Sequence, residues 1–318
     1  MKIRGAGVVL AVLLSAVPGG FVAAQNFPAR LVRIVSSAPG NLSDIMARIV
    51  AQELTKAWGQ PVIVENRANA MIAHEAVAKA VPDGYTLMFV SDSFVGSQFM
   101  GDARFRPLEE FSAVSLVALS PSVLVVSSTL PVNSVKALVA LAKARPGQLN
   151  FGSSTNGSTS HTAMELFNAM AGVKIVRVAY RGNAQAISAV IGGEVQVAMQ
   201  TVPIATPQIK AGKVKALAVT SPQPSALAPG LPTVAATLPG FEAQSLLGVV
   251  APTGTPGPVV SQIHQDIARA VRGAEVRERI IALGAQPVGN APEEFTAVLK
   301  MAIGRLDKLI RQTGLKLD

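Results

Sequence analysis

"QLNFGSSTNGSTSHTAMELF", from Gln148 to Phe167, joins a short apolar run to an amphipathic segment through a polar stretch. "LNFGS" is typical of a strand, and "HTAMELFNAMAG" is typical of a helix. The ten residues Gly152 to His161 contain no Asp, Glu, Lys or Arg. They offer hydroxyls, an amide and backbone N–H groups, which can hold an anion without a fixed positive charge. Because the stretch is longer than a helix N-cap needs, it favours binding over an ordinary turn.

The same strand–loop–helix unit recurs on both sides of this stretch. "LVRIVSS", "PVIVEN", "DGYTLMFVS" and "VKALAVT" read as strands. Helical patterns, such as "VKALVALAKA" from Val135 to Ala144, lie between the strands along nearly the whole chain. Solid apolar strands alternating with helices predict an α/β fold with a mostly parallel sheet that is covered on both faces.

"SVLVVSS" and "SLLGVVA" are candidate crossings between two lobes. The predicted lobe 1 comprises residues 25–121 and 249–318, and the predicted lobe 2 comprises residues 122–248. A Pro-rich segment, Ser221 to Gly240, interrupts the alternation and reads as an interdomain segment or surface arm. Ligands of open α/β sheets bind at the carboxyl ends of strands, so facing lobes would form a ligand cleft.

The first residues read as an export signal. Lys2 and Arg4 precede an apolar run, Val8 to Val17, that is too short to span a bilayer comfortably, and "FVAAQ" offers a cleavage site after Ala24. We therefore expect a signal peptide over residues 1–24 and a periplasmic mature chain. A membrane anchor is the competing interpretation.

Composition and missing motifs exclude several classes of function. The chain has no Cys, and its formal charge of +9 comes from thinly spread Lys and Arg, without the basic and aromatic clusters of a nucleic-acid interface. No hydrolase elbow or phosphate-binding loop occurs, and His74, His161 and His264 lack zinc-helix spacing. A Ser–His pair in the polar loop is conceivable as a nucleophile, but we expect no nearby group to supply the orienting carboxylate. We expect no enzyme activity, metal, cofactor or nucleic-acid partner.

Three blocks of sequence resemble one known family. "PGNLSDIMARIVAQEL", "LNFGSSTNGSTSHTAMELFNAMAGVKIVRVAYRGNAQAISAVIGGEVQVAM" and "IKAGKVKALAVTSPQPSALAPGLPTVAATLPGFEAQSLLGVVAPTGTP" are similar to the solute receptors of tripartite tricarboxylate transporters. The resemblance implies a two-lobed, type II periplasmic-binding-protein-like fold. It also implies a small organic carboxylate as ligand and a membrane permease as partner, and we expect a monomer. A sensing receptor that signals to a membrane sensor on the same fold is the alternative.

The loops that follow the predicted strands supply the candidate ligand site. The loop Ser37 to Asp44 would face the polar loop across the cleft, with Ser43 or Asp44 capping the first helix. The predicted ligand-binding residues are Ser37, Ala38, Asn41, Ser43, Asp44, Ser91, Ser153, Ser154, Asn156, Gly157, Ser158, Thr159, Tyr180, Arg181 and Gly182.

One departure from the family concerns the nature of the ligand. Where the family has a Gly-rich loop, residues Ala68 to Glu75 contain no Gly and include Met71 and Ile72. An apolar wall there would disfavour a second buried carboxylate, so we expect one gripped carboxylate and a less polar distal part. The competing interpretation is that His74 turns inward and replaces the lost donors when protonated.

Overall fold

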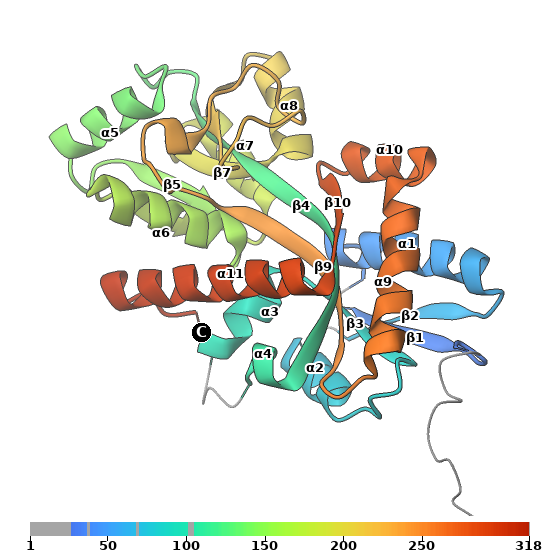
Figure 1. Cartoon of the computed structure of the whole chain (residues 1–318). Coiled ribbons are helices and arrows are strands. Elements are labelled where there is room, and N and C mark those ends of the chain that lie inside the picture. Colours follow the sequence, from blue (N-terminus) through green and yellow to red (C-terminus); the bar gives the residue numbers. More distant parts are fainter. Residues whose placement is uncertain (1–26, 37–38, 68–69, 101–104, 318) are drawn as a thin grey trace, which may run out of the picture.

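Ten strands form one strongly curled sheet in the described part of the chain (Figure 1). The computed structural model describes residues 27–36, 39–67, 70–100 and 105–317. The strands are β1 (Val32–Ser36), β2 (Val62–Asn66), β3 (Thr86–Val90), β4 (Phe111–Ser127), β5 (Asn150–Ser153), β6 (Val176–Ala179), β7 (Val197–Thr201), β8 (Val214–Val219), β9 (Gln244–Pro252) and β10 (Gln286–Asn290).

Helices follow most of these strands. The longer ones are α1 (Leu42–Trp58), α2 (Ala70–Ala78), α5 (Val135–Ala144), α6 (Thr159–Ala171), α7 (Asn183–Gly192), α8 (Val202–Lys210), α9 (Gly257–Arg272), α10 (Ala274–Ala282) and α11 (Pro292–Thr313). The short ones are α3 (Asp92–Gly96), α4 (Pro107–Glu110), η1 (Ser97–Phe99) and η2 (Val234–Ala236).

The sheet is parallel at its two ends and antiparallel at its centre. β2, β1 and β3 pair in parallel, as do β6, β5 and β7, whereas β4 pairs antiparallel with β7, β8, β9 and β10. The prediction of a mostly parallel sheet was therefore wrong at the centre. The physical reason is that the chain crosses the molecule along β4 and returns along β9, and strands that run in opposite directions pair antiparallel.

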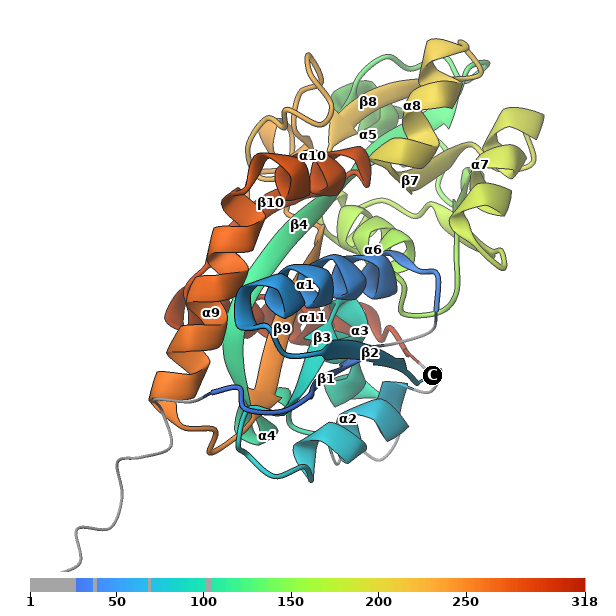
Figure 2. The same cartoon turned by 90° about the vertical axis from the view of Figure 1, so that its right-hand side faces the viewer.

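The two ends of the sheet have separate apolar cores. One half packs α1, α9 and α10 on one face and α2, α3 and α11 on the other (Figure 2). The other half packs α5 and α6 on one face and α7 and α8 on the other. The two-lobed α/β fold is thus confirmed, and the lobe boundaries near residues 121 and 248 remain our proposal. The Pro-rich segment packs Val234 and Leu227 onto the cores of the second half.

Some element boundaries follow the sequence pattern closely, and others do not. α5 spans the predicted residues, because the side chain of Ser134 caps it by accepting a hydrogen bond from Ala137 N at 3.1 Å. β4 begins eleven residues before the predicted crossing at Ser122, and β10 was not predicted. The polar loop is also shorter than expected, since β5 ends at Ser153 and α6 begins at Thr159.

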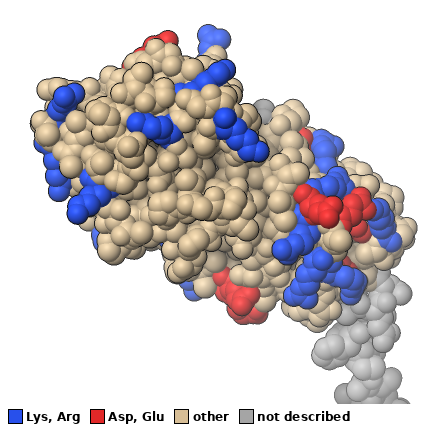
Figure 3. Space-filling view, turned by 90° about the horizontal axis from the view of Figure 1, so that it is seen from above, with Lys and Arg blue, Asp and Glu red and all other residues tan. Residues whose placement is uncertain are grey.

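Charged side chains are dispersed on the surface. On the face in Figure 3, Lys and Arg lie scattered over the left-hand lobe and mix with Asp and Glu near the other end. No helix among the described residues is both long and apolar enough to cross a bilayer. The predicted signal peptide lies outside the described residues.

Candidate functional site

A cavity of about 580 Å³ lies where the loops after β1, β3 and β5 converge. Each of these loops leaves the carboxyl end of a parallel strand, which is where α/β sheets place ligands. β9 and the C-terminal segment complete the wall. The lining residues are Asn41, Leu42, Ser43, Ser91, Asp92, Ser93, Gly96, Met100, Thr155, Asn156, Gly157, Ser158, Thr159, Ser245, Leu247 and Leu317.

The loop after β1 presents the start of α1 to this cavity. Asn41 is the N-cap, and its Oδ1 accepts a hydrogen bond from Asp44 N at 2.9 Å. The cap is therefore Asn41 rather than the predicted Ser43 or Asp44, which lie within the first turn. Ser43 is 5% exposed and lines the cavity, and its hydroxyl has no hydrogen-bond partner among the described residues. A buried hydroxyl without a partner is costly, which makes this group a candidate donor at the cavity.

Asp44 is buried behind the same loop and holds it in place. Its carboxylate accepts hydrogen bonds from Gly40 N and Asn66 Nδ2, each at 2.8 Å, and lies 3.1 Å from Arg48 Nε. Burial opposes ionisation, but these donors outweigh it and lower the pKa of Asp44 below its ordinary value. Asp44 is absent from the cavity lining, so the structure places it in support of the loop.

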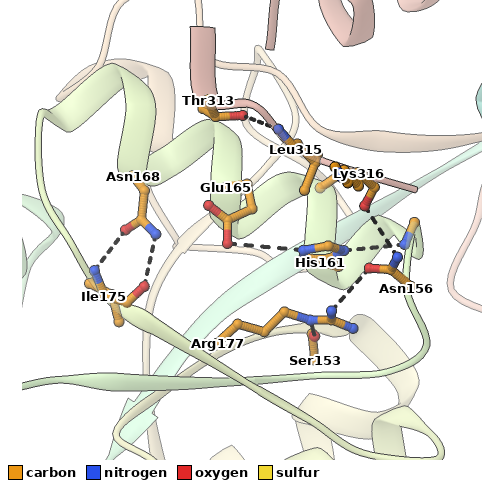
Figure 4. Close-up of polar contacts among 12 residues, drawn as sticks. Ser153, Asn156, His161, Glu165, Asn168, Ile175, Arg177, Thr313, Leu315 and Lys316 are labelled. Carbon is orange, nitrogen blue, oxygen red and sulfur yellow. Dashed lines mark hydrogen bonds and ion pairs between the residues drawn. The ribbon is translucent and has the colours of Figure 1, made fainter. Parts of the chain in front are cut away.

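The polar loop, residues 154–158, is held from below by one cation (Figure 4). Arg177 of β6 donates from Nε to Ser153 Oγ at 2.7 Å, from Nη1 to Asn156 Oδ1 at 3.0 Å and from Nη2 to the Ser154 carbonyl at 3.0 Å. Ser154 N also donates to Ser160 Oγ at 3.1 Å. Side chains that the sequence suggested as ligand donors thus accept hydrogen bonds that hold their own loop in place.

His161 fixes the other end of this loop. Gly157 N donates to His161 Nδ1 at 3.2 Å, so the ring proton sits on Nε2, which faces Glu165 Oε1 at 4.0 Å (Figure 4). Burial, with the charge of Arg177, lowers the pKa of His161 to about 4. The expectation that no carboxylate lies near this histidine was wrong, because Glu165 follows His161 by one turn of α6. His161 Nδ1 nevertheless accepts a backbone N–H, which is not the arrangement of a Ser–His nucleophile pair.

Asp92 brings a negative group to a cavity whose lining, among the described residues, contains no Lys or Arg. Thr159 Oγ1, at the start of α6, donates to Asp92 Oδ2, and Leu246 N donates to Oδ1 at 3.1 Å. Burial raises the pKa of Asp92, although the hydrogen bonds from Ser245, Thr159 and Leu246 oppose that rise. The carboxylate joins α3 to both α6 and β9, across the cleft.

The cavity brings together about half of the predicted site. The predicted residues that line it are Asn41, Ser43, Ser91, Asn156, Gly157, Ser158 and Thr159. Those that the structure describes away from its wall are Asp44, Ser153, Ser154, Tyr180, Arg181 and Gly182. Ser37 and Ala38 lie outside the described residues. A role in ligand binding stays a prediction for all of them.

The side chains that the structure describes in the stretch expected to form an apolar wall, Met71 to Glu75, are absent from the cavity lining. His74 is 1% exposed and stacks on Phe105 at 4.5 Å between ring centroids, with Phe94 at its edge. Burial lowers the pKa of His74 to about 4, so the structure does not support a protonated His74 in the cleft. Met71 and Ile72 are exposed and do not line the cavity.

Several lining residues had little or no signal in the sequence. Asp92 follows a predicted strand directly and could have been found from that position. Ser245 and Leu317 reach the cavity only through the return strand β9 and the C-terminal segment. Among the described residues, no group of three or more His, Asp or Glu side chains is placed to hold a metal ion.

Comparison with known proteins identifies the family of this chain. Residues 46–315 match the tripartite tricarboxylate transporter family receptor. The chain is 36% identical over 303 residues to Protein BugT of Bordetella pertussis, covering 93% of each chain. A protein of R. palustris solved with adipate is 31% identical with a TM-score of 0.75, covering 91% of this chain and 99% of that one. MatC from Rhodopseudomonas palustris, solved with bound malate, is 29% identical with a TM-score of 0.72, covering 89% and 100%.

These solved structures have the two-lobed binding-protein fold that the sequence predicts, and the family match spans both of its lobes. The chain therefore belongs to the tripartite tricarboxylate transporter receptor family.

Proposed function

We propose that this protein is a periplasmic receptor that binds one small organic carboxylate between its lobes and delivers it to a tripartite tricarboxylate-type permease. Receptors of this family bind a substrate rather than transform it. In the proposed complex, one carboxylate is gripped at the polar side of the cavity and a less polar part points to the opposite side. The ligands of the two R. palustris relatives, adipate and malate, belong to the same chemical class.

The observation that carries the proposal is the unpaired hydroxyl of Ser43. It is buried in the first turn of a 17-residue helix, lines the cavity and has no partner among the described residues. The N-terminal turn of a helix favours negative charge, because its N–H groups lack partners within the helix. A ligand carboxylate at this point would accept the hydrogen bond that Ser43 does not make inside the chain.

Apolar side chains from four segments support the less polar distal part. Leu42, Met100, Leu247 and Leu317 line the same cavity. Each square ångström of apolar ligand surface buried against them would contribute about 25 cal/mol, whereas a second carboxylate there would lack partners. We therefore expect citrate and other tricarboxylates to bind poorly.

A calorimetric panel of monocarboxylates, dicarboxylates and tricarboxylates tests the proposal. We expect at least one mono- or dicarboxylate to bind, and Ser43→Ala to weaken that binding by about 10- to 150-fold, because a hydrogen bond to a charged group is worth about 1.5–3 kcal/mol. Ser188→Ala, which changes an exposed hydroxyl on α7, is the matched control. Absence of binding across the panel, or equal affinity in S43A and wild type, would contradict the proposed site.

Experiments in the cell distinguish a role in transport from a role in sensing. Mass spectrometry of ligand released from the purified protein identifies the cargo. Deletion of the gene should then abolish uptake of that compound if the protein feeds a permease. Normal uptake with loss of a transcriptional response would favour the sensing alternative.

A further inference from the structure

The chain turns sharply after α11 and runs back toward the cavity. Gly314 ends the helix with a φ of 69°, a left-handed conformation that favours glycine, and its N–H donates to the Ile310 carbonyl at 2.8 Å. Leu315 N then donates to Thr313 Oγ1 at 3.2 Å (Figure 4). These bonds set the direction of the C-terminal tail, defined here as residues 315–317.

The tail is fastened to the polar loop. Asn156 Nδ2 donates to the Lys316 carbonyl at 3.2 Å, while Asn156 Oδ1 accepts from Arg177 (Figure 4). The amide of Asn156 thus connects the tail to the cation that shapes the loop. Ordering these residues costs conformational entropy, and the hydrogen bonds from Asn156 to the Lys316 carbonyl and from Leu315 to Thr313 help to offset that cost.

Leu317 is the buried part of the tail. It is 2% exposed, yet it belongs to none of the four apolar core clusters formed by the described residues. It lines the ligand cavity together with Gly96 and Gly157. A Cβ placed at Gly157 would lie 3.7 Å from Leu317 Cδ2, and one at Gly96 would lie 4.0 Å from Cδ1. Leu317 therefore fills the space between α3 and the polar loop at the edge of the cavity.

We propose that Leu317 is a specificity-determining residue that limits the length of the carboxylate ligand by closing one side of the cavity. This inference rests on the proposed function and adds the residue that sets ligand length. Ser43 and Leu317 come from opposite ends of the chain and line one cavity. In the proposed complex, the carboxylate accepts hydrogen bonds at the start of α1, and the other part of the ligand meets the Leu317 side chain.

The substitution Leu317→Ala removes three carbon atoms from this wall, and Leu317→Phe adds bulk. We expect L317A to shift the preferred ligand toward chains one or two methylenes longer, and L317F to shift it toward shorter chains. The ligand that binds most tightly to the wild-type protein should bind about tenfold more weakly to L317A, because apolar contact area on the ligand is lost.

Calorimetry on the full mature protein, with straight-chain mono- and dicarboxylates of four to ten carbons as probes, tests the inference. Leu315→Ala is the matched control, since Leu315 lies in the same tail but not in the cavity wall. Thermal unfolding of each variant checks that the fold is intact. A chain ending at Gly314 gives a second test, and it should lose length preference while still binding.

The outcomes distinguish a failure of the proposed function from a failure of the inference about Leu317. If wild type binds no probe, the proposed function fails. If wild type binds with a length optimum that L317A and L317F leave unchanged, or if all lengths weaken equally, the inference about Leu317 is overturned while the proposed function stands. Opposite shifts of the optimum in the two variants, with L315A unchanged, support it.

Discussion

The two loops that face each other across the cavity are built alike but held differently. Both leave a parallel strand and start a helix with a polar N-cap, Asn41 in one and Ser158 in the other. The loop after β1 is held by a carboxylate, Asp44. The hydroxyl of the neighbouring Ser43 is unpaired among the described residues. The polar loop is held by a cation, Arg177, whose three donors engage the loop itself.

This difference indicates that the two loops have different roles in the candidate site. On the α1 side, the proposed ligand would meet a buried donor that the described residues leave unpaired. On the α6 side, the polar groups mostly fix the loop, so the wall is preorganised before a ligand arrives. Preorganisation improves binding because less conformational freedom is lost when the complex forms.

The largest expected effect comes from removing the cation below the polar loop. Arg177→Met leaves the hydrogen-bonding groups of Ser153, Ser154 and Asn156 without their donor, which should lower the free energy of unfolding by about 2–4 kcal/mol. Arg48→Met is the matched change behind the other loop. The Arg48 side chain is 54% exposed, so its loss should cost less than about 1 kcal/mol. Urea unfolding measures both, and equal losses would break the comparison.

The next effect is a pH dependence of stability, to which the polar loop contributes through His161 and the first half of the sheet contributes through His74. The folded pKa of His161, about 4, lies below its ordinary value of 6.5. Unfolding therefore takes up a proton between these values, so the free energy of unfolding falls as pH drops from about 6.5 to 4. We expect His161→Gln to remove about 1–3 kcal/mol of this fall.

Urea unfolding at pH 7.5 and pH 4.5 checks that expectation. His264→Gln is the control, because His264 is only partly buried and lies away from the polar loop. Burial lowers the pKa of His264 as well, so H264Q should also remove part of the fall, but a smaller part than H161Q removes. A wild-type slope retained in H161Q would show that His161 is not the titrating group.

The smallest expected effect concerns the negative group between the two loops. Because burial raises the pKa of Asp92 and its carboxylate lines the cavity, the affinity for an anionic ligand should rise as the pH is lowered and Asp92 takes up a proton. Asp92→Asn removes the like charge and should strengthen carboxylate binding about tenfold at pH 8, while flattening the pH dependence. Calorimetry over a series of pH values measures this. Weaker binding by D92N would mean that the ligand donates a hydrogen bond to Asp92 instead.

The fold was readable from the sequence where local signals were strong. α5 matched its predicted bounds because Ser134 caps an uninterrupted helical pattern. β10, "QPVGN", contains Pro and Gly, which weaken a strand signal, and its pairing with β4 depends on distant residues. The early start of β4 at Phe111 was missed because "FSAVSLVALS" mixes Ser and Ala with its apolar residues and is ordered by β9.

The site was only partly readable for the same reason. Ser158 carries a local capping signal at a strand end, so its place at the cavity followed from the pattern, whereas the pattern pointed to Ser43 or Asp44 as the cap of α1 and the cap is Asn41. The sequence could not show that Arg177 engages Ser153 and Ser154, because that contact requires the register of β5 with β6. Leu317 reaches the cavity through the tertiary course of α11, which leaves no local trace.

A crystal structure of the protein with the carboxylate identified by the panel tests the central claim most directly. We expect a ligand carboxylate oxygen within about 3 Å of Ser43 Oγ, with the remainder of the ligand directed toward the apolar wall that includes Leu317. A ligand bound elsewhere, or one whose carboxylate contacts the polar loop while Ser43 stays unpaired, would contradict the account.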